Sequence, residues 1–151
     1  MTGANPKAIS SHISGTLKTK AKSITKGSVG LAAAKKIASW CGSHISYGSY
    51  NDFNASPETV LRRGYGNCCD QTRLMLSLMD TAGCLEYLTL KYVYVCCSSK
   101  GVGHIFAQII QKGNGSKRYV DPCKSSSPWG NHVTGWGSPP GRTTTYPTRP
   151  F

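Results

Sequence analysis

The sequence contains few acidic residues, few histidines and no long apolar runs. Each shortage limits the possible class of protein, its partners or its catalytic residues. No stretch of its 151 residues approaches the roughly 18 apolar positions of a membrane-spanning helix, so we expect no membrane partner. The first residues, MTGANPKAISSHISG, lack the apolar core of a secretory signal. Either the chain stays inside the cell that makes it, or Met1 begins an excised piece of a longer protein.

Cysteine is abundant, but its spacing is not that of a zinc module or of a disulfide framework. The seven cysteines stand at positions 41, 68, 69, 84, 96, 97 and 123. No C-x-x-C pair occurs, and adjacent doublets are poor ligands for structural zinc. An odd number also excludes a complete set of intramolecular disulfides. Reduced thiols, some of them buried as small hydrophobic side chains, fit best, and we expect the protein to need reducing conditions.

The shortage of acids leaves a large positive charge. Eighteen Lys and Arg stand against six Asp and Glu, for a formal net charge of +12. Such an excess usually indicates a polyanionic partner, with nucleic acid as the first candidate and a carboxylate-rich polymer such as a cell wall as the second. A solvated helix face is the alternative reading of a part of this charge. That part consists of Lys18, Lys20, Lys22, Lys26, Lys35 and Lys36.

The periodic segments in the first half of the chain predict helices. Residues 1–27 are polar and basic, and they form either a linker or an N-terminal helix around GTLKTKAKSITKG. Apolar residues at three-to-four spacing predict a helix from Ser28, with Ser28 as the N-cap and Gly42 as the stop. A short helix follows in SPETVLRRG, with Pro57 at its first position. The segment CCDQTRLMLSLMDTAG predicts a buried central helix that ends at Gly83.

Residues typical of strands follow the central helix. They predict one strand over about 86–96, a second in GHIFAQIIQ and a third in SKRYVD, the last two joined by a KGNG turn. From Pro122 onward Ser, Pro, Gly and Trp predict irregular structure, and the tail GRTTTYPTRPF carries no core signal. We therefore expect one α+β domain over residues 28–151, with helices packed on one antiparallel sheet.

Two adjacent cysteines, Cys68 and Cys69, stand at the start of the central helix in YGNCCDQTRLML. A helix N-terminus favours the thiolate through the helix dipole, and its backbone N–H groups can donate to an oxyanion. Gly66 permits a tight entry from the preceding loop. The pair can be a nucleophile with a bystander, a metal site, half of a disulfide framework, or buried filler at the start of a core helix.

A thiol nucleophile needs a base and a group that orients the base. Of the four histidines, His104 opens an apolar strand, where an imidazole can face a cleft or simply bond to the backbone. Of the six acids, Asp121 ends the strand that returns beside that of His104. Asp80 lies near the far end of the central helix and Glu86 lies beyond it, so both are on the wrong side for Cys68. The sequence therefore favours His104 and Asp121 as the pair that could serve a cysteine.

The loop between these two strands decides whether Asp121 can reach His104. A tight two-residue turn would place Asp121 opposite Gln108, about 13 Å along the strand from His104. A four-residue loop over 112–115 would place it opposite Phe106, with His104 as its diagonal neighbour at about 7–8 Å. A Cys-His-Asp site therefore predicts the longer loop or a bulge.

The motifs GNCCD, GHIFAQI and YVDP, in this order, resemble the pattern of transglutaminase-like cysteine hydrolases. Within that superfamily the sequence is most similar to the pseudomurein endoisopeptidases, lytic enzymes associated with methanogenic archaea and their viruses. The similarity covers roughly residues 16–137. It includes AAAKKIASWCGSHISYGSYN and TVLRRGYGNCCDQT upstream and VDPCKSSSPWGN downstream. It implies a papain-like core, with the thiol helix packed against the sheet that carries the other two groups.

The resemblance also implies residue roles. The G-x-C motif selects Cys68 as the nucleophile, His104 as its base and Asp121 as the orienting group. Asp70 is the acid that many relatives carry two residues after the cysteine, and Phe106 stands where relatives often have Trp. The further oxyanion or substrate candidates are Tyr50, Asn51, Asn67, Gln71, Trp129, Asn131 and Trp136. An aromatic loop and hydrophobic closure by the tryptophans explain several of these residues equally well.

The activity that the resemblance implies is hydrolysis of the Ala–Lys isopeptide cross-link of archaeal pseudomurein through an acyl-enzyme, carried out by a cysteine peptidase domain over 28–151. Pseudomurein is polyanionic, which fits the net charge of +12. The chemistry requires no cofactor, and Ca²⁺ is possible by family resemblance only, because six acids without ligand spacing give it no support. We expect a monomer that is made in the cytoplasm of an archaeal host and acts on the cell wall, as a catalytic domain cut from a longer chain.

Two other functions explain part of the sequence. A transglutaminase-type acyl transferase would use the same three residues with an amine in place of water. A basic nucleic-acid-binding module would explain the charge without catalysis, but it leaves the order of Cys, His and Asp motifs unexplained.

Overall fold

The computed structural model describes residues 15–48, 55–95, 104–123 and 143–146. Its helices are α2 (Gly15–Thr25), α3 (Gly30–His44), α4 (Pro57–Arg63) and α5 (Cys68–Thr81), followed by a 3₁₀ turn, η1 (Cys84–Glu86). Its strands are β1 (Ser46–Tyr47), β2 (Tyr65–Gly66), β3 (Leu88–Val95), β4 (His104–Gln111), β5 (Lys117–Val120) and β6 (Thr143–Tyr146). The predicted order, helices and then a sheet, is confirmed.

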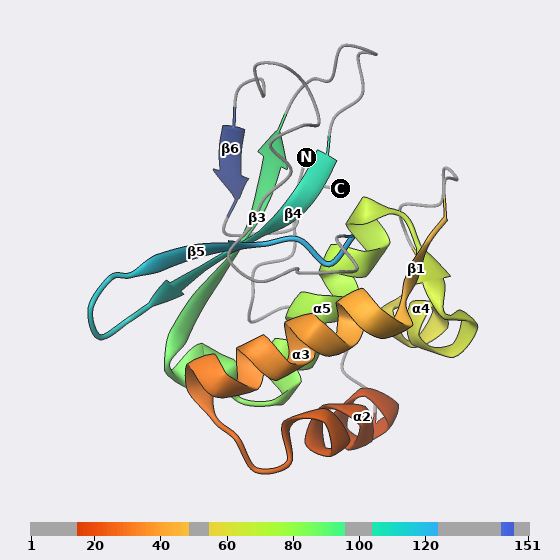
Figure 1. The fold of residues 1–151 in the computed structure, drawn as a ribbon, viewed down its shortest axis with the longest axis horizontal. Coiled ribbons are helices and arrows are strands. Elements are labelled where there is room, and N and C mark those ends of the chain that lie inside the picture. The colour runs from red at the N-terminus through yellow and green to blue at the C-terminus, as the bar shows by residue number, and fades with distance from the viewer. Residues whose placement is uncertain (1–14, 49–54, 96–103, 124–142, 147–151) are drawn as a thin grey trace.

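The main sheet is antiparallel and has the strand order β5-β4-β3-β6. The helices lie together on one side of this sheet, with α5 next to β4 (Figure 1). A second, two-stranded parallel sheet pairs β1 with β2, directly before the cysteine doublet. The predicted α+β class, with helices packed on one antiparallel sheet, is therefore confirmed.

Helix α5 is the centre of the hydrophobic core, as its sequence predicts. Leu74, Met75, Leu78 and Met79 are all fully buried. The helix contacts α2, α3 and α4 as well as β4, so its apolar side chains are covered from several directions. Burial of each such side chain contributes about 1.5–3 kcal/mol, which makes α5 a rigid support for whatever its first residues carry.

The first helical segment belongs to the same core. Of the two possibilities for residues 1–27, the structure has a helix over Gly15–Thr25, and its Leu17, Ala21 and Thr25 side chains are buried. This helix contacts α3 and α5. None of the described helices combines the length and the apolar character that crossing a bilayer requires.

Both predicted limits of the second helix are wrong. Helix α3 begins at Gly30 with Val29 as its N-cap, because the Ser28 hydroxyl instead accepts a hydrogen bond from Lys36 Nζ at 2.7 Å. Gly42 does not end the helix, which continues to His44. A glycine inside a helix costs about 1 kcal/mol, and burial of Cys41 beside it and of Ile45 after it offsets this cost. The short helix α4 is confirmed, with Ser56 as N-cap.

The tail was predicted to contribute nothing to the core, and this is wrong for residues 143–146. They form β6, which pairs with β3 from Tyr92↔Tyr146 to Val95↔Thr143. Tyr146 packs against the main core. Strand pairing over so long a sequence separation leaves no local pattern in the sequence, which is why the tail appears irregular there.

Candidate active site

A capping box fixes the start of α5 at Cys68. Asn67 is the N-cap, and its Oδ1 accepts a hydrogen bond from the Asp70 backbone N–H at 3.0 Å. The Asp70 carboxylate in turn accepts from the Asn67 backbone N–H at 3.4 Å. Arg63 forms an ion pair with the same carboxylate oxygen, also at 3.4 Å. Cys68 is therefore the first helical residue, where the N–H groups of the first turn and the helix dipole favour negative charge.

The chain enters this helix through a space that only glycine fits. A Cβ added to Gly66 would lie 2.9 Å from Asp70 Cβ and 3.3 Å from Val60 Cγ1. Gln71 Nε2 donates to the carbonyls of Gly66 at 2.8 Å and of Ser46 at 3.2 Å. These contacts hold both strands of the small parallel sheet against the first turn of α5.

The hairpin between β4 and β5 has the longer of the two possible loops. Its register runs from Ile110↔Lys117 to Ala107↔Val120, which brings Asp121 level with Phe106. Gln111 N donates to Ser116 O at 2.9 Å and closes a four-residue loop. The tight turn, which would have carried Asp121 away from His104, is absent from this hairpin.

His104 and Asp121 form a buried hydrogen-bonded pair. His104 Nε2 and Asp121 Oδ2 are 2.9 Å apart, and the two side chains are only 2% and 0% exposed. The other carboxylate oxygen accepts a hydrogen bond from the Cys123 backbone N–H at 3.0 Å. The Phe106 ring stacks beside the imidazole at a centroid distance of 5.8 Å. The carboxylate therefore fixes the orientation of the ring and directs Nδ1 away from itself.

The helix and the sheet are joined next to these groups. Thr72 lies one turn after Cys68, and its hydroxyl donates a hydrogen bond to the Ile105 carbonyl at 3.3 Å. Ile105 directly follows His104, and its backbone also forms a hydrogen bond with the Cys68 sulfur. The distance between thiol and imidazole is thus set by contacts between α5 and β4.

The two adjacent thiols are electrostatically unequal. The pKa of Cys68 is lowered to about 4, chiefly by a hydrogen bond from the Cys69 thiol; burial opposes this shift, while a hydrogen bond and the positive charge of His104 support it. The pKa of Cys69 is raised, first by that same hydrogen bond and then by burial. Cys69 therefore keeps its proton and Cys68 carries the charge.

His104 is the positive partner of this thiolate. Burial, the largest influence, lowers its pKa, but hydrogen bonds to Asp121 and Cys68 and their negative charges together raise it to about 9. Between pH values of about 4 and about 9 the site thus holds a thiolate beside an imidazolium.

The other candidate residues that the structure describes have structural roles and do not line an open substrate site. Asn67 caps the helix and is 4% exposed, and Gln71 is 1% exposed with its amide nitrogen bonded to two backbone carbonyls. The remaining candidates lie outside the described residues. These are Tyr50, Asn51, Trp129, Asn131 and Trp136.

Sequence reasoning missed two residues beside the thiols, Tyr47 and Cys123. The pKa of Tyr47 is raised by partial burial and then by the negative charge of Cys68, which places its phenol near that sulfur. Tyr47 opens the YGSYN segment, and its pairing with Gly66 brings it to the site. A two-residue strand has no detectable sequence pattern, so no local signal pointed to Tyr47.

Comparison with known proteins identifies the family. A model of the transglutaminase-like superfamily matches residues 18–115, which is more than half of the chain and contains both Cys68 and His104. The chain belongs to this superfamily. The match ends before Asp121, whose place in the site rests on the hairpin geometry. No curated protein matches the chain.

Solved structures share this fold at low sequence identity. A proposed cysteine protease from Cytophaga hutchinsonii is 13% identical, with a TM-score of 0.58 over 86% of this chain and 47% of that one. LapG from Legionella pneumophila is 14% identical, with a TM-score of 0.57 over 85% of this chain and 78% of that one. The chain thus spans about half the length of the first of these proteins.

LapG from Legionella pneumophila has also been solved in a calcium-bound form. That form is 16% identical to this chain, with a TM-score of 0.53 over 80% of this chain and 71% of that one. It raises the question whether this chain has a calcium site. Within the described residues, one group of three or more potential metal ligands occurs, and it consists of His104, Asp121 and Cys123. Ca²⁺ takes six to eight oxygen ligands, whereas this group offers nitrogen, sulfur and a single carboxylate. These residues do not fit Ca²⁺.

Proposed function

We propose that the protein is a cysteine peptidase in which Cys68, His104 and Asp121 act together. The observation that carries the proposal is the His104–Asp121 pair, buried and joined at 2.9 Å, beside a thiol at the first turn of a rigid helix. A thiolate next to an imidazolium is the resting state that thiol hydrolysis needs. The similarity to a proposed cysteine protease supports the same class.

Each step of the reaction uses a group in this site. The Cys68 sulfur attacks the substrate carbonyl carbon, and the N–H groups at the start of α5 stabilise the oxyanion. His104 gives its proton to the leaving amine as the C–N bond breaks, which leaves a thioester on Cys68. His104 then takes a proton from water, which attacks the thioester and releases the acid. Asp121 holds the imidazole in the tautomer and orientation that both transfers require.

The proposed substrate is the Ala–Lys isopeptide cross-link of pseudomurein. Two observations support it: the motif resemblance to pseudomurein endoisopeptidases, and the net charge of +12, which suits a polyanionic wall. On this proposal the protein acts as a monomer on the wall of an archaeal host during lysis. A nucleic-acid-binding module is less well supported, because it gives no reason for a buried Cys-His-Asp arrangement.

The decisive experiment combines variants with fragment analysis. We expect Cys68→Ala and His104→Ala to abolish release of soluble fragments from purified pseudomurein, because each removes a reacting group. Cys69→Ala should retain measurable activity. Mass analysis of the fragments should show cleavage at the Ala–Lys bond. Undiminished lysis by Cys68→Ala would overturn the mechanism, and cleavage at another bond would overturn the substrate.

Acyl transfer to an amine is the second candidate, because a thioester can be attacked by an amine as well as by water. Incubation with a labelled primary amine separates the two reactions. Hydrolysis predicts unlabelled wall peptides, whereas transfer predicts label in the peptides at the expense of free acid.

A further inference from the structure

Cys123 brings a third potential metal ligand to the His104–Asp121 pair. One imidazole nitrogen, one carboxylate oxygen and the Cys123 sulfur all lie within 4.8 Å of one another. His104 and Asp121 are buried, and Cys123 is partly buried. The mechanism above gives no role to the Cys123 thiol, which forms a hydrogen bond with the Asp121 side chain.

The separation and the chemistry of these three groups suit one class of metal ion. Zn²⁺ binds nitrogen and oxygen at about 2.0–2.2 Å and sulfur at about 2.3 Å, which places tetrahedral ligand atoms about 3.3–3.7 Å apart. His104 Nε2 and Asp121 Oδ2 are now 2.9 Å apart in a direct hydrogen bond. An ion bound to both atoms replaces that bond, so the carboxylate oxygen must move aside from the lone pair of the nitrogen. Mixed nitrogen, oxygen and sulfur ligands favour Zn²⁺ and Co²⁺ over the hard cations Mg²⁺ and Ca²⁺.

The backbone after β5 holds the carboxylate beside the other two potential ligands. Asp121 Oδ1 accepts the Cys123 backbone N–H, which leaves Oδ2 pointing toward His104 Nε2. Because Asp121 and Cys123 are separated only by Pro122, the turn that makes this hydrogen bond also brings the sulfur near the carboxylate. A hydrogen bond of this kind to a metal-binding carboxylate is a usual feature of metal sites.

We propose that His104, Asp121 and Cys123 form an inhibitory binding site for a thiophilic divalent cation of the Zn²⁺ class. Binding displaces the Nε2 proton of His104 and the thiol proton of Cys123 into solvent, because both atoms must offer a lone pair to the metal. The ion then stands between the imidazole and its orienting carboxylate. Metal binding rests on the geometry alone, whereas inhibition rests also on the proposed function.

Cobalt provides the direct test, because a thiolate bound to Co²⁺ adds a charge-transfer absorption to the visible bands of a tetrahedral ion. The full chain, reduced and then freed of reductant and chelator, is titrated with Co²⁺ in the absence of substrate. We expect both absorptions to appear and to be removed by Zn²⁺. Cys123→Ser should lose the charge-transfer band and bind Zn²⁺ at least about tenfold more weakly.

Two further variants separate this site from capture of the metal by other thiols. Cys84→Ala removes a buried thiol that contacts the Gly30 carbonyl instead, and it should bind Co²⁺ as the unaltered protein does. Cys68→Ala should also keep the charge-transfer band, because the nucleophile is not among the three ligands. A band that survives in Cys123→Ser but disappears in Cys68→Ala would overturn the proposal, as would the absence of Co²⁺ binding to the unaltered protein.

If Cys123→Ser fails to fold, the unaltered protein can still be used to test the metal site. X-ray absorption of its Zn²⁺ complex should show one sulfur together with imidazole and oxygen, and a shell of two or more sulfurs would contradict the site. Because neither measurement uses a substrate, metal binding by a chain that cleaves nothing would overturn the proposed function and leave the metal site standing.

Discussion

Single residues determine the chemistry of this site, and the clearest example is the contrast between Cys68 and Cys69. The two thiols are adjacent in sequence, but one is the first residue of α5 beside His104 and the other is turned about 100° around the helix, where it is 7% exposed. The second thiol donates a hydrogen bond to the first and so shares in lowering its pKa. Cys69 therefore helps to keep the Cys68 thiol ionised and is not simply a buried hydrophobic side chain.

The pKa of Cys68 predicts unusual reactivity at low pH. Only the thiolate form of a thiol reacts. Below its pKa of about 8.5, an ordinary thiol is therefore alkylated about tenfold faster for each unit by which the pH rises. Cys68, with a pKa of about 4, should react with iodoacetamide at nearly the same rate from pH 6 to pH 8. Peptide mapping by mass spectrometry, with EDTA present to remove metal, measures this rate at each cysteine.

Two variants of the neighbouring residue control this experiment. Cys69→Ala removes the largest cause of the shift, so the pKa of Cys68 should rise and its labelling at pH 6 should slow. Cys69→Ser keeps a hydrogen-bond donor and should stay closer to the unaltered rate. If labelling of Cys68 rises tenfold per pH unit up to pH 8 in the unaltered protein, the ion pair does not exist.

At the scale of residues, the sequence could predict a contact between groups that stand at the ends of neighbouring strands. His104 and Asp121 could be paired because each stands at the end of a strand and a hairpin register relates them. Tyr47 and Cys123 could not be found, because their positions depend on the parallel pairing of β1 with β2 and on a turn after β5.

Secondary-structure elements hold these residues at fixed distances, and the junction between β2 and α5 is the most crowded point. Gly66 ends β2, and two residues later Cys68 begins α5. The Asp70 side chain fills the space next to Gly66 while it completes the capping box. Correct placement of Cys68, the proposed nucleophile, therefore depends on the absence of a side chain at position 66.

Substitution of this glycine should damage both stability and activity. In Gly66→Ala the new Cβ meets Asp70 Cβ at 2.9 Å, where both atoms are fixed by backbone, so the helix start must shift. Overpacking of this kind typically costs about 1–3 kcal/mol. Urea unfolding should show the loss of stability, and fragment release from pseudomurein should fall with it.

Gly113→Ala is the matched control, because a Cβ at this loop position has nothing within 4 Å. Its free energy of unfolding should stay within about 0.5 kcal/mol of the unaltered protein. Equal stability of the two variants would show that the junction can relax without cost.

Elements with strong local patterns could be predicted, and those made by distant pairing could not. The apolar character of α5, the proline at the start of α4 and the strand-forming residues of β4 all predicted their elements. Val29 replaced Ser28 as the cap of α3 because Lys36 occupies the serine hydroxyl, a contact that no propensity contains. Strand β6 exists only because β3 offers it a free edge.

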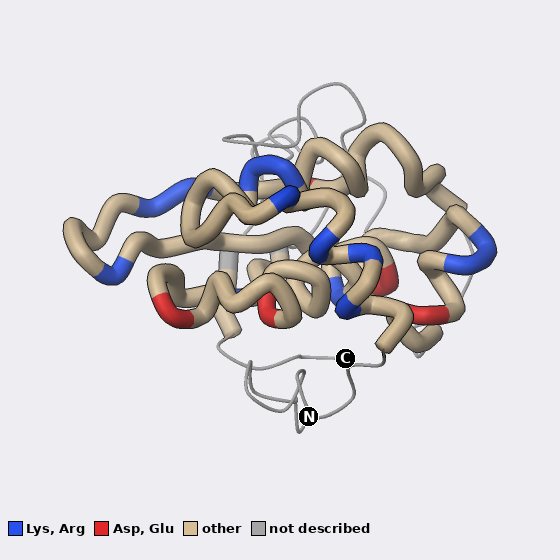
Figure 2. Tube along the Cα trace, turned by 90° about the horizontal axis from the view of Figure 1, so that it is seen from below, with Lys and Arg blue, Asp and Glu red and all other residues tan. Residues whose placement is uncertain are grey.

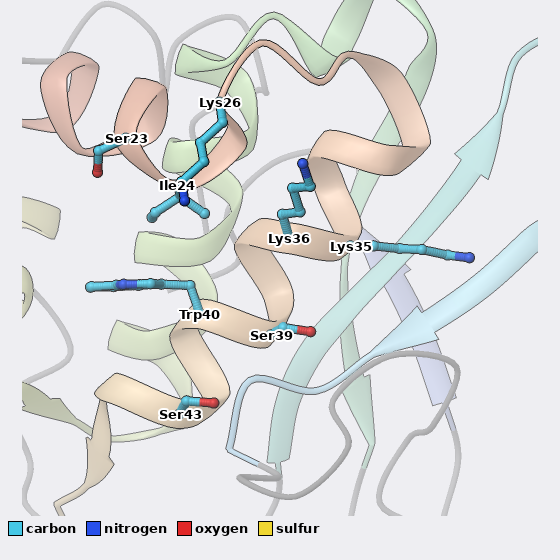
Figure 3. Close-up of a pocket in the computed structure, with 8 residues that line it drawn as sticks. All are labelled: Ser23, Ile24, Lys26, Lys35, Lys36, Ser39, Trp40 and Ser43. Carbon is cyan, nitrogen blue, oxygen red and sulfur yellow. The ribbon is translucent and has the colours of Figure 1, made fainter.

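At the scale of the whole molecule, positive charge is the property that links the site to its proposed substrate. Figure 2 shows Lys and Arg positions on the helices and on the β4–β5 hairpin, with few acidic positions between them. Several lysines border a hollow of about 520 Å³ between the end of α2 and one face of α3 (Figure 3). Lys36 is held there by the Thr25 carbonyl and the Ser28 hydroxyl.

Aromatic and cationic groups lie together at this hollow, which favours an acidic polymer over a neutral one. Trp40 forms part of its wall and stacks on His44 at 4.6 Å, while Lys20 Nζ lies 5.1 Å from the Trp40 ring centroid. Lys26 reaches toward the same space from the end of α2 (Figure 3). We expect this surface to hold the carboxylates of the wall while the site acts on its cross-links.

Reversal of one charge at the hollow should weaken wall binding without affecting the chemistry. Lys26→Glu should lower binding to pseudomurein sacculi about fivefold, equivalent to about 1 kcal/mol of exposed ion pairing, and the loss should shrink at high salt. Hydrolysis of a short isopeptide substrate should be unchanged, because none of the residues that line the hollow belongs to the Cys68 site. Lys117→Glu on β5 makes the same charge change elsewhere, and sedimentation with sacculi compares the two. If both variants lose binding equally, the wall responds to the net charge of the molecule and the hollow has no special part in holding it.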